Sequence, residues 1–180
     1  MLLRTLKGTG PGVFLLLIIF LVITWAQIWF INPPEYVSEP GTWAVPLNML
    51  LRSLVTELPF TAVILPAIFI ILMMYLMVSF NTTAFFINER TFLPAFFYLT
   101  LVSLFPEYQR LNPVMPAAIC LIIAIMRIAD SYRISGIAYN YFDAALLVSI
   151  GSMFYLPLLW FGLLIFIGIA VFRTGNLIEV

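Results

Sequence analysis

The stretch GSMFYLPLLWFG, residues Gly151 to Gly162, contains no charged side chain and lies between two apolar runs. Pro157 stands near its centre, so the stretch is either the kinked middle of one long helix or the tip of a helical hairpin. A single helix over residues 142–172 would be about 46 Å long at about 1.5 Å per residue. Two helices of about 15 residues would each be about 23 Å long, whereas the apolar core of a bilayer is about 30 Å thick. Length alone leaves both alternatives open.

The composition of the chain is typical of a protein embedded in lipid. Of its 180 residues, 64% are hydrophobic and only 9% are charged, whereas soluble domains have about 25% charged residues. A chain of this length cannot enclose so much apolar surface in one water-soluble core. The formal net charge is zero, which argues against nucleic acid as a partner. We therefore predict an all-α membrane protein in contact with membrane lipids.

Residue types and missing motifs limit the chemistry that the sequence supports. It contains no histidine, which is the commonest metal ligand and general base. The single cysteine, Cys120, falls inside an apolar run and is interpreted as a small core residue. No phosphate-binding loop, nucleophile elbow, zinc motif or dinucleotide fingerprint occurs. The sequence therefore predicts neither a metal nor a cofactor, and an ion pump that works alone is not expected.

Apolar runs predict about six transmembrane helices plus one interfacial amphipathic helix, all within a single transmembrane domain at residues 1–180. The first run is too long for the apolar region of a signal peptide and lacks a clear cleavage site, so we expect it to be retained. The third to sixth runs are short, which predicts a recess on the outer side of that half. The predicted membrane helices cover residues 13–31, 60–80, 91–105, 113–128, 141–156 and 158–172.

Particular residues indicate where these helices end. Trp25 and Trp29 are typical of an aromatic belt at the membrane surface. Asn112 is placed to cap the helix that follows it. Asn140 is similarly placed, with Asp143 in the first turn of the next helix. The small residues of that helix predict a packing face; they are Ala145, Ser149 and Ser152.

Residues 46–58 have a different pattern, which predicts an amphipathic helix lying in the membrane interface beside the outer loop. One helical face is apolar and consists of Leu47, Leu50, Leu51, Leu54 and Leu58. The other face is polar and consists of Asn48, Arg52, Ser53, Thr56 and Glu57.

The positions of arginine and lysine favour the hairpin. With six crossings and both termini inside, six of the eight basic residues lie on the cytoplasmic side. One long helix would move Arg173 outside and leave five. Because basic residues concentrate on the cytoplasmic side, we predict a hairpin with Pro157 at its tip. We also predict a bacterial inner-membrane location with the N- and C-termini in the cytoplasm.

Charged residues outside the apolar runs are the candidate functional groups. Glu35 and Glu39 in the outer loop are either solvated carboxylates or a general base or cation ligand at the membrane surface. Arg52 and Arg110 are candidates for binding a phosphate or lipid headgroup, together with Glu107, which is also spaced to pair with Arg110.

The second group of candidates is predicted on the inner side. Arg127, Asp130 and Asp143 are expected to form a structural charge cluster. Asp143 is explained either by its position in the first turn of a helix or by pairing with Arg127 across two helices.

The second half of the chain resembles a family of polytopic inner-membrane proteins from Bacteroidota whose activity is uncharacterised. The resemblance covers about Thr91 to Arg173, and the first apolar run fits loosely. Members of that family continue with further membrane helices, which predicts that this chain is short or truncated. The strings that carry the resemblance are LVSLFPEYQRLNP, AIMRI and YFDAALLVSIGSMFYLPLLWFGLLIFIGIAVFR.

A second resemblance is to the membrane module of glycosyltransferases that use polyprenyl-phosphate sugars. It is carried by PPEY in the outer loop and by the amphipathic segment. It implies Glu35 or Glu39 as a base and Arg52 or Arg110 as a phosphate ligand. That family usually has an aspartate-containing pair in the outer loop, where this chain has two separate glutamates.

Three functions fit these observations. The short chain and its few polar groups favour a non-catalytic subunit or scaffold of a membrane complex in the cell envelope, with other membrane subunits as partners. The first alternative is a lipid-linked-sugar transferase of reduced size. The second alternative is a small transport subunit that binds a hydrophobic or amphipathic solute in the outer recess.

Overall fold

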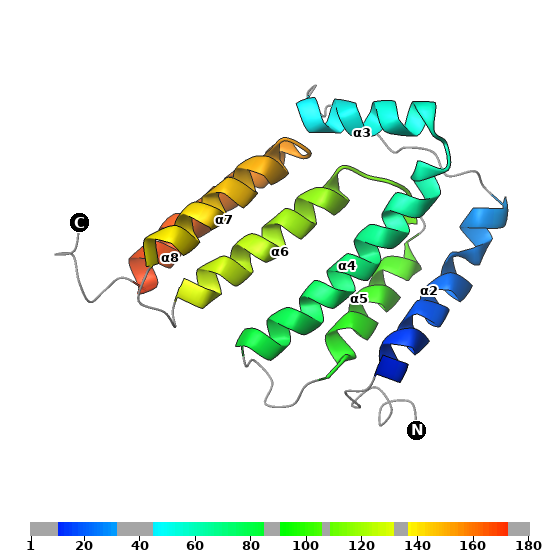
Figure 1. The fold of residues 1–180 in the computed structure, drawn as a ribbon, viewed down its shortest axis with the longest axis horizontal. Helices are drawn as coiled ribbons and strands as arrows, with labels where there is room; N and C mark the ends of the chain where they lie inside the picture. The colour runs from blue at the N-terminus through cyan, green and yellow to red at the C-terminus, as the bar shows by residue number, and fades with distance from the viewer. Residues whose placement is uncertain (1–10, 32–44, 85–90, 106–108, 132–136, 173–180) are drawn as a thin grey trace.

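A computed structural model describes residues 11–31, 45–84, 91–105, 109–131 and 137–172 of the chain (Figure 1). This described part contains seven α-helices, one 3-10 helix and no strand, which confirms the predicted all-α class there. The helices are α2 (Pro11–Ile31), α3 (Pro46–Glu57), α4 (Thr61–Ala84), α5 (Leu93–Leu104), α6 (Val114–Ser131), α7 (Ile137–Ser152), the 3-10 helix η2 (Leu156–Phe161) and α8 (Gly162–Phe172).

Six of the α-helices run roughly parallel or antiparallel to one another, and α3 lies across one end of them (Figure 1). We call the end beside α3 the upper end and the opposite end the lower end. The chain runs toward the upper end in α2, α5 and α7 and away from it in α4, α6 and α8 (Figure 1). The start of α2 and the end of α8 therefore lie at the same, lower end.

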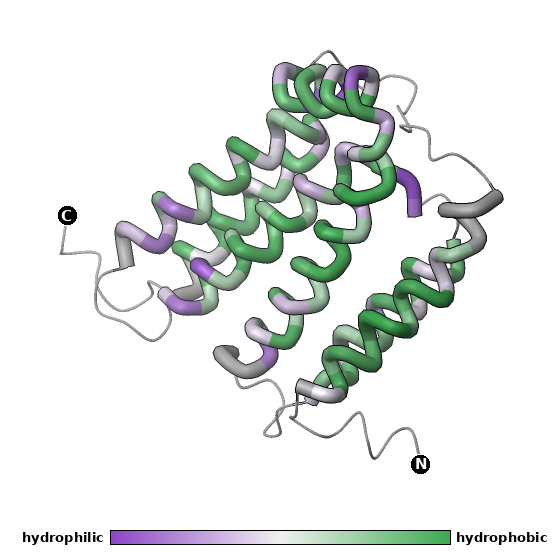
Figure 2. Tube along the Cα trace, turned by 45° about the vertical axis from the view of Figure 1, so that its right-hand side comes forward, coloured by the Kyte–Doolittle hydropathy of each residue, from purple (hydrophilic) through white to green (hydrophobic). Residues whose placement is uncertain are grey.

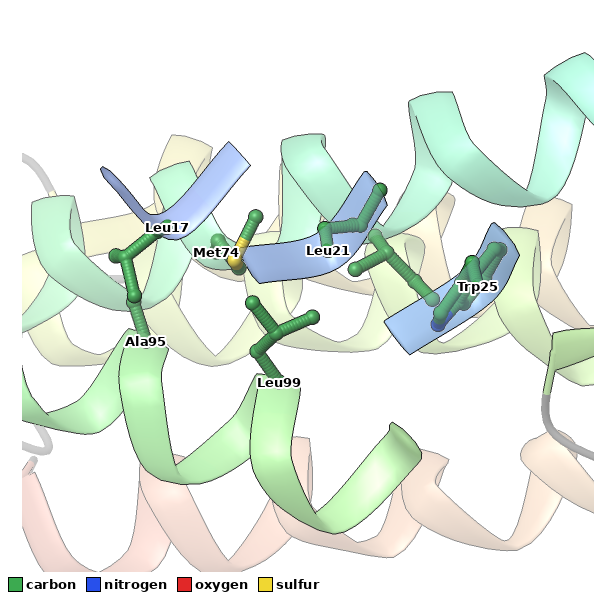
Figure 3. Close-up of a cluster of buried hydrophobic side chains, with 7 residues drawn as sticks. Leu17, Leu21, Trp25, Met74, Ala95 and Leu99 are labelled. Carbon is green, nitrogen blue, oxygen red and sulfur yellow. The ribbon is translucent and has the colours of Figure 1, made fainter. Parts of the chain in front are cut away.

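Helices α2, α4 and α5 share one buried core (Figure 3). Two aromatic pairs join α2 to the start of α5, with ring centroids 6.3 Å apart for Phe14 and Phe92 and 5.9 Å apart for Phe20 and Phe96. These pairs show that α2 and α5 run side by side in the same direction. The core consists of Leu17, Leu21, Trp25, Ile70, Met74, Ala95 and Leu99.

Trp25 belongs to this core, so its predicted place in an interfacial aromatic belt is wrong. Its side chain is 0% exposed and lies between α2 and α5 (Figure 3). The sequence pattern could not reveal this, because α2 is apolar on all sides and no polar face marks its outward direction. Trp29 lies outside the residues whose side chains are described.

The question raised by Gly151–Gly162 is answered in favour of a hairpin. The hydroxyl of Tyr141, near the start of α7, donates a hydrogen bond of 3.1 Å to the carbonyl oxygen of Gly168, near the end of α8. Ile165 of α8 also shares a core with α6 and α7. Helix α8 therefore returns along α7. The other buried members of that core are Ala124, Tyr141, Ala144 and Val148.

The tip of the hairpin differs from the prediction. The reversal occurs at residues 153–155, where the N–H groups of Phe154 and Tyr155 both donate to the carbonyl oxygen of Gly151 at 3.1 Å. Pro157 follows the reversal and stands in the first turn of η2. Proline is tolerated there because the N–H groups of the first turn have no partner within the helix.

Of the two asparagines predicted to cap the start of a helix, one does so and the other does not. Asn112 caps α6 as predicted, since its side-chain oxygen accepts a hydrogen bond of 3.0 Å from the N–H of Val114. Asn140 is not a cap, because α7 already begins at Ile137 and ends at Ser152. The prediction that all of the third to sixth membrane helices are short is wrong for the helix predicted at residues 113–128, because α6 has 18 residues.

Small residues pack α7 against its neighbours, and the prediction is confirmed in part, because Ser152 is buried and Ala145 packs against the core shared with α6 and α8. Ser149 is exposed, whereas Ala144 and Gly151 are buried. A Cβ atom added at Gly151 would lie 3.0 Å from Cβ of Cys120 and 3.5 Å from the carbonyl oxygen of Ala117, both on α6. The close approach of the two helices therefore depends on glycine at this position.

Two helical segments in the described part are long and apolar enough to cross a membrane, Thr61–Asn81 in α4 and Val114–Ser131 in α6. Three shorter apolar segments accompany them, Gly12–Ala26, Leu93–Leu104 and Leu156–Ala170. Figure 2 shows hydrophobic residues along most of the helix lengths, and hydrophilic ones mainly in α3, after α5, and near the lower ends of α6 and α7.

Candidate functional site

The predicted site residues that the structure describes fall into two groups at opposite ends of the bundle. Arg52 on α3 and Arg110, in the turn between α5 and α6, belong to the upper end (Figure 1). Arg127 and Asp130 near the end of α6, and Asp143 in α7, belong to the lower end. The structure therefore does not join these five residues into one site. Glu35, Glu39 and Glu107 lie outside the described residues.

At the lower end an ion pair links α6 to α7. Nε of Arg127 lies 3.7 Å from Oδ2 of Asp143, and both side chains are about half exposed, 48% and 47%. Asp143 thus pairs across helices and does not lie in the first turn of α7. No ion pair joins Asp130 to another residue of the described part. A solvent-screened ion pair of this kind contributes about 0.2–1 kcal/mol to the stability of the folded protein, which is a small amount.

A buried hydrogen bond holds the lower part of the α7–α8 hairpin. Replacing Tyr141 by phenylalanine is expected to destabilise the folded bundle by about 0.5–1.5 kcal/mol, because the carbonyl oxygen of Gly168 loses the donor that it has in the native protein. The measurement is the midpoint of unfolding in an SDS titration of mixed micelles. Replacing Tyr139, which is 81% exposed, by phenylalanine is the matched control and is expected to leave the midpoint unchanged. Equal midpoints for both variants would contradict a stabilising role for this bond.

At the upper end, a chain of hydrogen bonds connects the α5–α6 turn to α5 and α2. Nε2 of Gln109 donates to the carbonyl oxygen of Ser103 at 2.9 Å. The Ser103 hydroxyl donates to Oγ1 of Thr24 at 3.3 Å, and the Thr24 hydroxyl donates to the carbonyl oxygen of Phe20 at 2.9 Å. Gln109 is only 6% exposed, so a buried side chain attaches this turn to α5. We call Thr24, Ser103 and Gln109 the upper polar network.

The sequence analysis missed the upper polar network, although a signal was present. Thr24 and Ser103 are polar side chains inside runs that are mostly apolar. A polar group in an apolar run needs a partner, and that need points to a contact between the two helices. The partner itself was not evident, because the two residues are far apart in the sequence.

Arg110 lies next to this network and is half-buried. Its neighbours Gln109 and Leu111 are both buried, and Asn112 caps α6 two residues later. No carboxylate of the described part lies within ion-pair distance of Arg110. Of the two arginines predicted to bind an anion, Arg110 therefore lies in structured polar surroundings, whereas Arg52 is exposed on α3.

On helix α3, only some residues of the predicted apolar face are buried, which the helical pattern did not predict. Leu51 and Asn48 are buried, although Asn48 belongs to the predicted polar face. Leu50 and Leu54 remain exposed. The reason is that α3 lies across the ends of the bundle and contacts it along one side only (Figure 1). The exposed leucines, together with Met49 and Leu58, form an apolar ridge beside Arg52.

The described residues contain no group of three or more potential metal-binding side chains. Comparison with family models, with curated proteins and with solved structures finds no match to this chain.

Proposed function

We propose that this chain is a multi-pass inner-membrane protein of the bacterial cell envelope that acts as a non-catalytic subunit or scaffold of a membrane complex. Its N- and C-termini are on the cytoplasmic side. The observation that carries the proposal is the distribution of exposed apolar side chains. On α4 they follow one side of the helix at Ile64, Ile68, Leu72 and Tyr75.

Helices α2, α5, α7 and α8 of the bundle also expose apolar side chains. Soluble monomers rarely expose contiguous apolar patches larger than about 300–600 Å², whereas here exposed Leu, Ile and Phe side chains occur on helices around the bundle (Figure 2). In lipid these surfaces need no further cover. The exposed residues are Leu15, Ile19 and Ile23 on α2, Phe97 and Leu101 on α5, Phe142 and Leu146 on α7, and Leu163, Phe166 and Ile167 on α8.

The positions of the polar groups support the same proposal. Arg52 belongs to the upper end, whereas Arg127 and Asp143 lie at the lower end, as expected for a bundle whose ends face two aqueous compartments. The backbone N–H and C=O groups of an α-helix form hydrogen bonds with one another inside the helix, as a lipid environment requires. The start of α2 and the end of α8 share the lower end, in agreement with termini on one side (Figure 1).

A structural role is favoured because several of the described polar side chains join helices or fix a helix end. Asn112 caps α6, Gln109 ties a turn to α5, and Arg127 links α6 to α7. Each of these interactions fixes one helix relative to another or fixes a helix end. This arrangement suits a protein that presents a defined surface to other membrane subunits.

The proposal is tested first by membrane extraction and then by purification. We expect the chain to stay in the membrane pellet after sodium carbonate washing and to copurify with a stoichiometric membrane partner in mild detergent. Release by carbonate would exclude membrane insertion. A carbonate-resistant protein that purifies alone, with no partner at any detergent concentration tested, would exclude the subunit role.

The enzyme alternative has a separate test. Glu35 and Glu39 are its candidate bases, and a double variant, Glu35→Gln with Glu39→Gln, removes both carboxylates. Under the scaffold proposal this variant complements a deletion of the gene fully. Loss of complementation with normal membrane levels of the variant would favour the lipid-linked-sugar transferase.

A further inference from the structure

The α7–α8 hairpin reverses at the upper end of the bundle and has an apolar surface there (Figure 1). We call residues 153–161 the hairpin tip. Within it, Leu159 and Trp160 are 61% and 76% exposed, whereas Leu158 is buried. The other large apolar side chains exposed on the tip are those of Met153, Leu156 and Phe161. Most of the large apolar side chains of the tip therefore point away from the bundle.

The tip is far along the chain from any charged residue. Residues 144–172 contain no aspartate, glutamate, lysine or arginine. Asp143, which precedes them, belongs to the lower end and pairs there with Arg127. The chain thus runs from the lower end to the upper end and back without a charge. Turns that reach water are rich in polar residues, and this turn has the opposite composition.

The backbone of the reversal is also suited to an apolar medium. Pro157 has no N–H group to satisfy. Paired N–H groups can enter lipid, whereas unpaired ones are costly there. The N–H groups that donate to carbonyl oxygens of the hairpin, at 3.0–3.1 Å, are those of Met153, Phe154, Tyr155 and Leu158.

The length of α7 places the tip near the boundary of the apolar layer. Helix α7 has 16 residues and is therefore about 24 Å long, whereas the apolar core of a bilayer is about 30 Å thick. With the start of α7 at the lower boundary, the end of α7 does not extend beyond the upper boundary. Trp160 suits this depth, because its ring is apolar, its N–H group needs an acceptor, and tryptophan concentrates at the level of the headgroups.

We propose that the hairpin tip contacts phospholipid at the boundary between the headgroups and the acyl chains of the upper leaflet, with Trp160 at the level of the headgroups. This inference rests on the proposed membrane location. Lipid is the favoured occupant because the apolar surface is continuous: exposed side chains lead along α7, over the tip and back along α8. A protein partner would need polar groups at the rim of the contact. Among the exposed residues of the tip, only Trp160 has a polar group in its side chain.

The test compares how often a nitroxide spin label collides with oxygen, which concentrates in lipid, and with a water-soluble nickel chelate. The label is attached to Trp160→Cys in a Cys120→Ala background. Phe166→Cys, at a 71% exposed position of α8, is the lipid-facing reference, and Ser53→Cys, at an exposed position of α3, is the water-facing reference. Each protein is purified in mild detergent with any partner that it retains and is reconstituted in phosphatidylcholine vesicles.

We expect the ratio of oxygen to nickel collisions at residue 160 to be several-fold higher than at residue 53 and lower than at residue 166. A ratio equal to that at residue 53 would place the tip in water and overturn the inference. A ratio equal to that at residue 166 would place it among the acyl chains, away from the headgroups, and would also overturn it. Low collision rates with both reagents would show that a protein chain covers the tip, which excludes lipid as the occupant.

Leu159→Cys repeats the measurement at a second exposed position of the tip while keeping the tryptophan. We expect its collision ratio also to lie between those of the two references. A ratio equal to that at residue 53 would show that the tip lies in water when Trp160 is present, and would overturn the inference.

Failure of this inference is distinguishable from failure of the proposed function. Carbonate extraction of the wild-type chain reports membrane insertion without reference to the hairpin tip. A chain that resists extraction, but whose label at residue 160 collides with nickel as often as the label at residue 53, refutes only the lipid contact of the tip. Cysteine variants that resist extraction and have wild-type SDS midpoints are folded, so their collision ratios can be interpreted.

Discussion

Replacing Trp25 by alanine is expected to destabilise the bundle by about 3 kcal/mol. The indole is 0% exposed and fills the core between α2 and α5, so alanine leaves a cavity there (Figure 3). Core Trp→Ala changes cost about 3–5 kcal/mol in soluble proteins. We expect the lower limit, because burial between helices in a lipid-like medium gains packing but little hydrophobic free energy.

Trp160 provides the matched control for this variant. It is the same residue type but is 76% exposed at the tip of the α7–α8 hairpin. Trp160→Ala is expected to change stability by less than about 0.5 kcal/mol. The measurement is pulse proteolysis of both variants across an SDS titration in mixed micelles. Equal losses for the two tryptophans would contradict the core position of Trp25.

Replacing Gly151 by valine is expected to cost about 1–3 kcal/mol and to loosen the hairpin. A Cβ atom at this position would overlap Cδ2 of Leu158 and lie 3.0 Å from Cβ of Cys120. The Leu158 side chain can rotate away, but Cβ of Cys120 is attached directly to the backbone of α6 and cannot. The carbonyl oxygen of Ala117 is already at van der Waals distance from the added Cβ atom, 3.5 Å, so no room is left for further atoms. The γ-carbons of valine would therefore separate α7 from α6.

Gly162 is the control for this second variant, because an added Cβ atom there meets nothing within 4 Å. Gly162→Val is expected to leave the SDS midpoint within about 0.5 kcal/mol of wild type. Labelling of Cys120 by a small maleimide reports the opening directly and should be faster in Gly151→Val. A valine at Gly151 with the wild-type midpoint and labelling rate would show that the two helices do not approach as closely as described.

Part of the fold could be predicted because it depends on local properties of the chain. Asn112 followed by proline predicts a helix start, and the structure places the cap there. The alternative in which Asp143 pairs with Arg127 is also found. The hairpin was favoured by counting basic residues, and the bond from Tyr141 to Gly168 confirms it. Its turn, however, precedes Pro157, because proline fits the start of a helix better than the reversal itself.

The candidate site was less predictable, because its parts come from distant segments. Arg110 was recognised as a cation in a polar turn, but the sequence did not show that side chains of α5 and α2 connect to this turn through hydrogen bonds. That connection consists of the contact between Thr24 and Ser103 and of the buried side chain of Gln109. Arg52 was ranked equally with Arg110, since only the packing of α3 shows that it is exposed.

The sequence by itself determined that the described part of the chain is helical, rich in apolar residues and polar chiefly at the ends of its helices. These properties depend on residue types and on their order along the chain, and they do not depend on which side of a helix faces inward. Only the tertiary structure decided that Trp25 is in the core and Trp160 is not, and that α7 approaches α6 closely at Gly151. The physical reason is that helices with apolar side chains all round show no contrast between faces. Their packing is therefore set by the shapes of the side chains, which hydropathy does not encode.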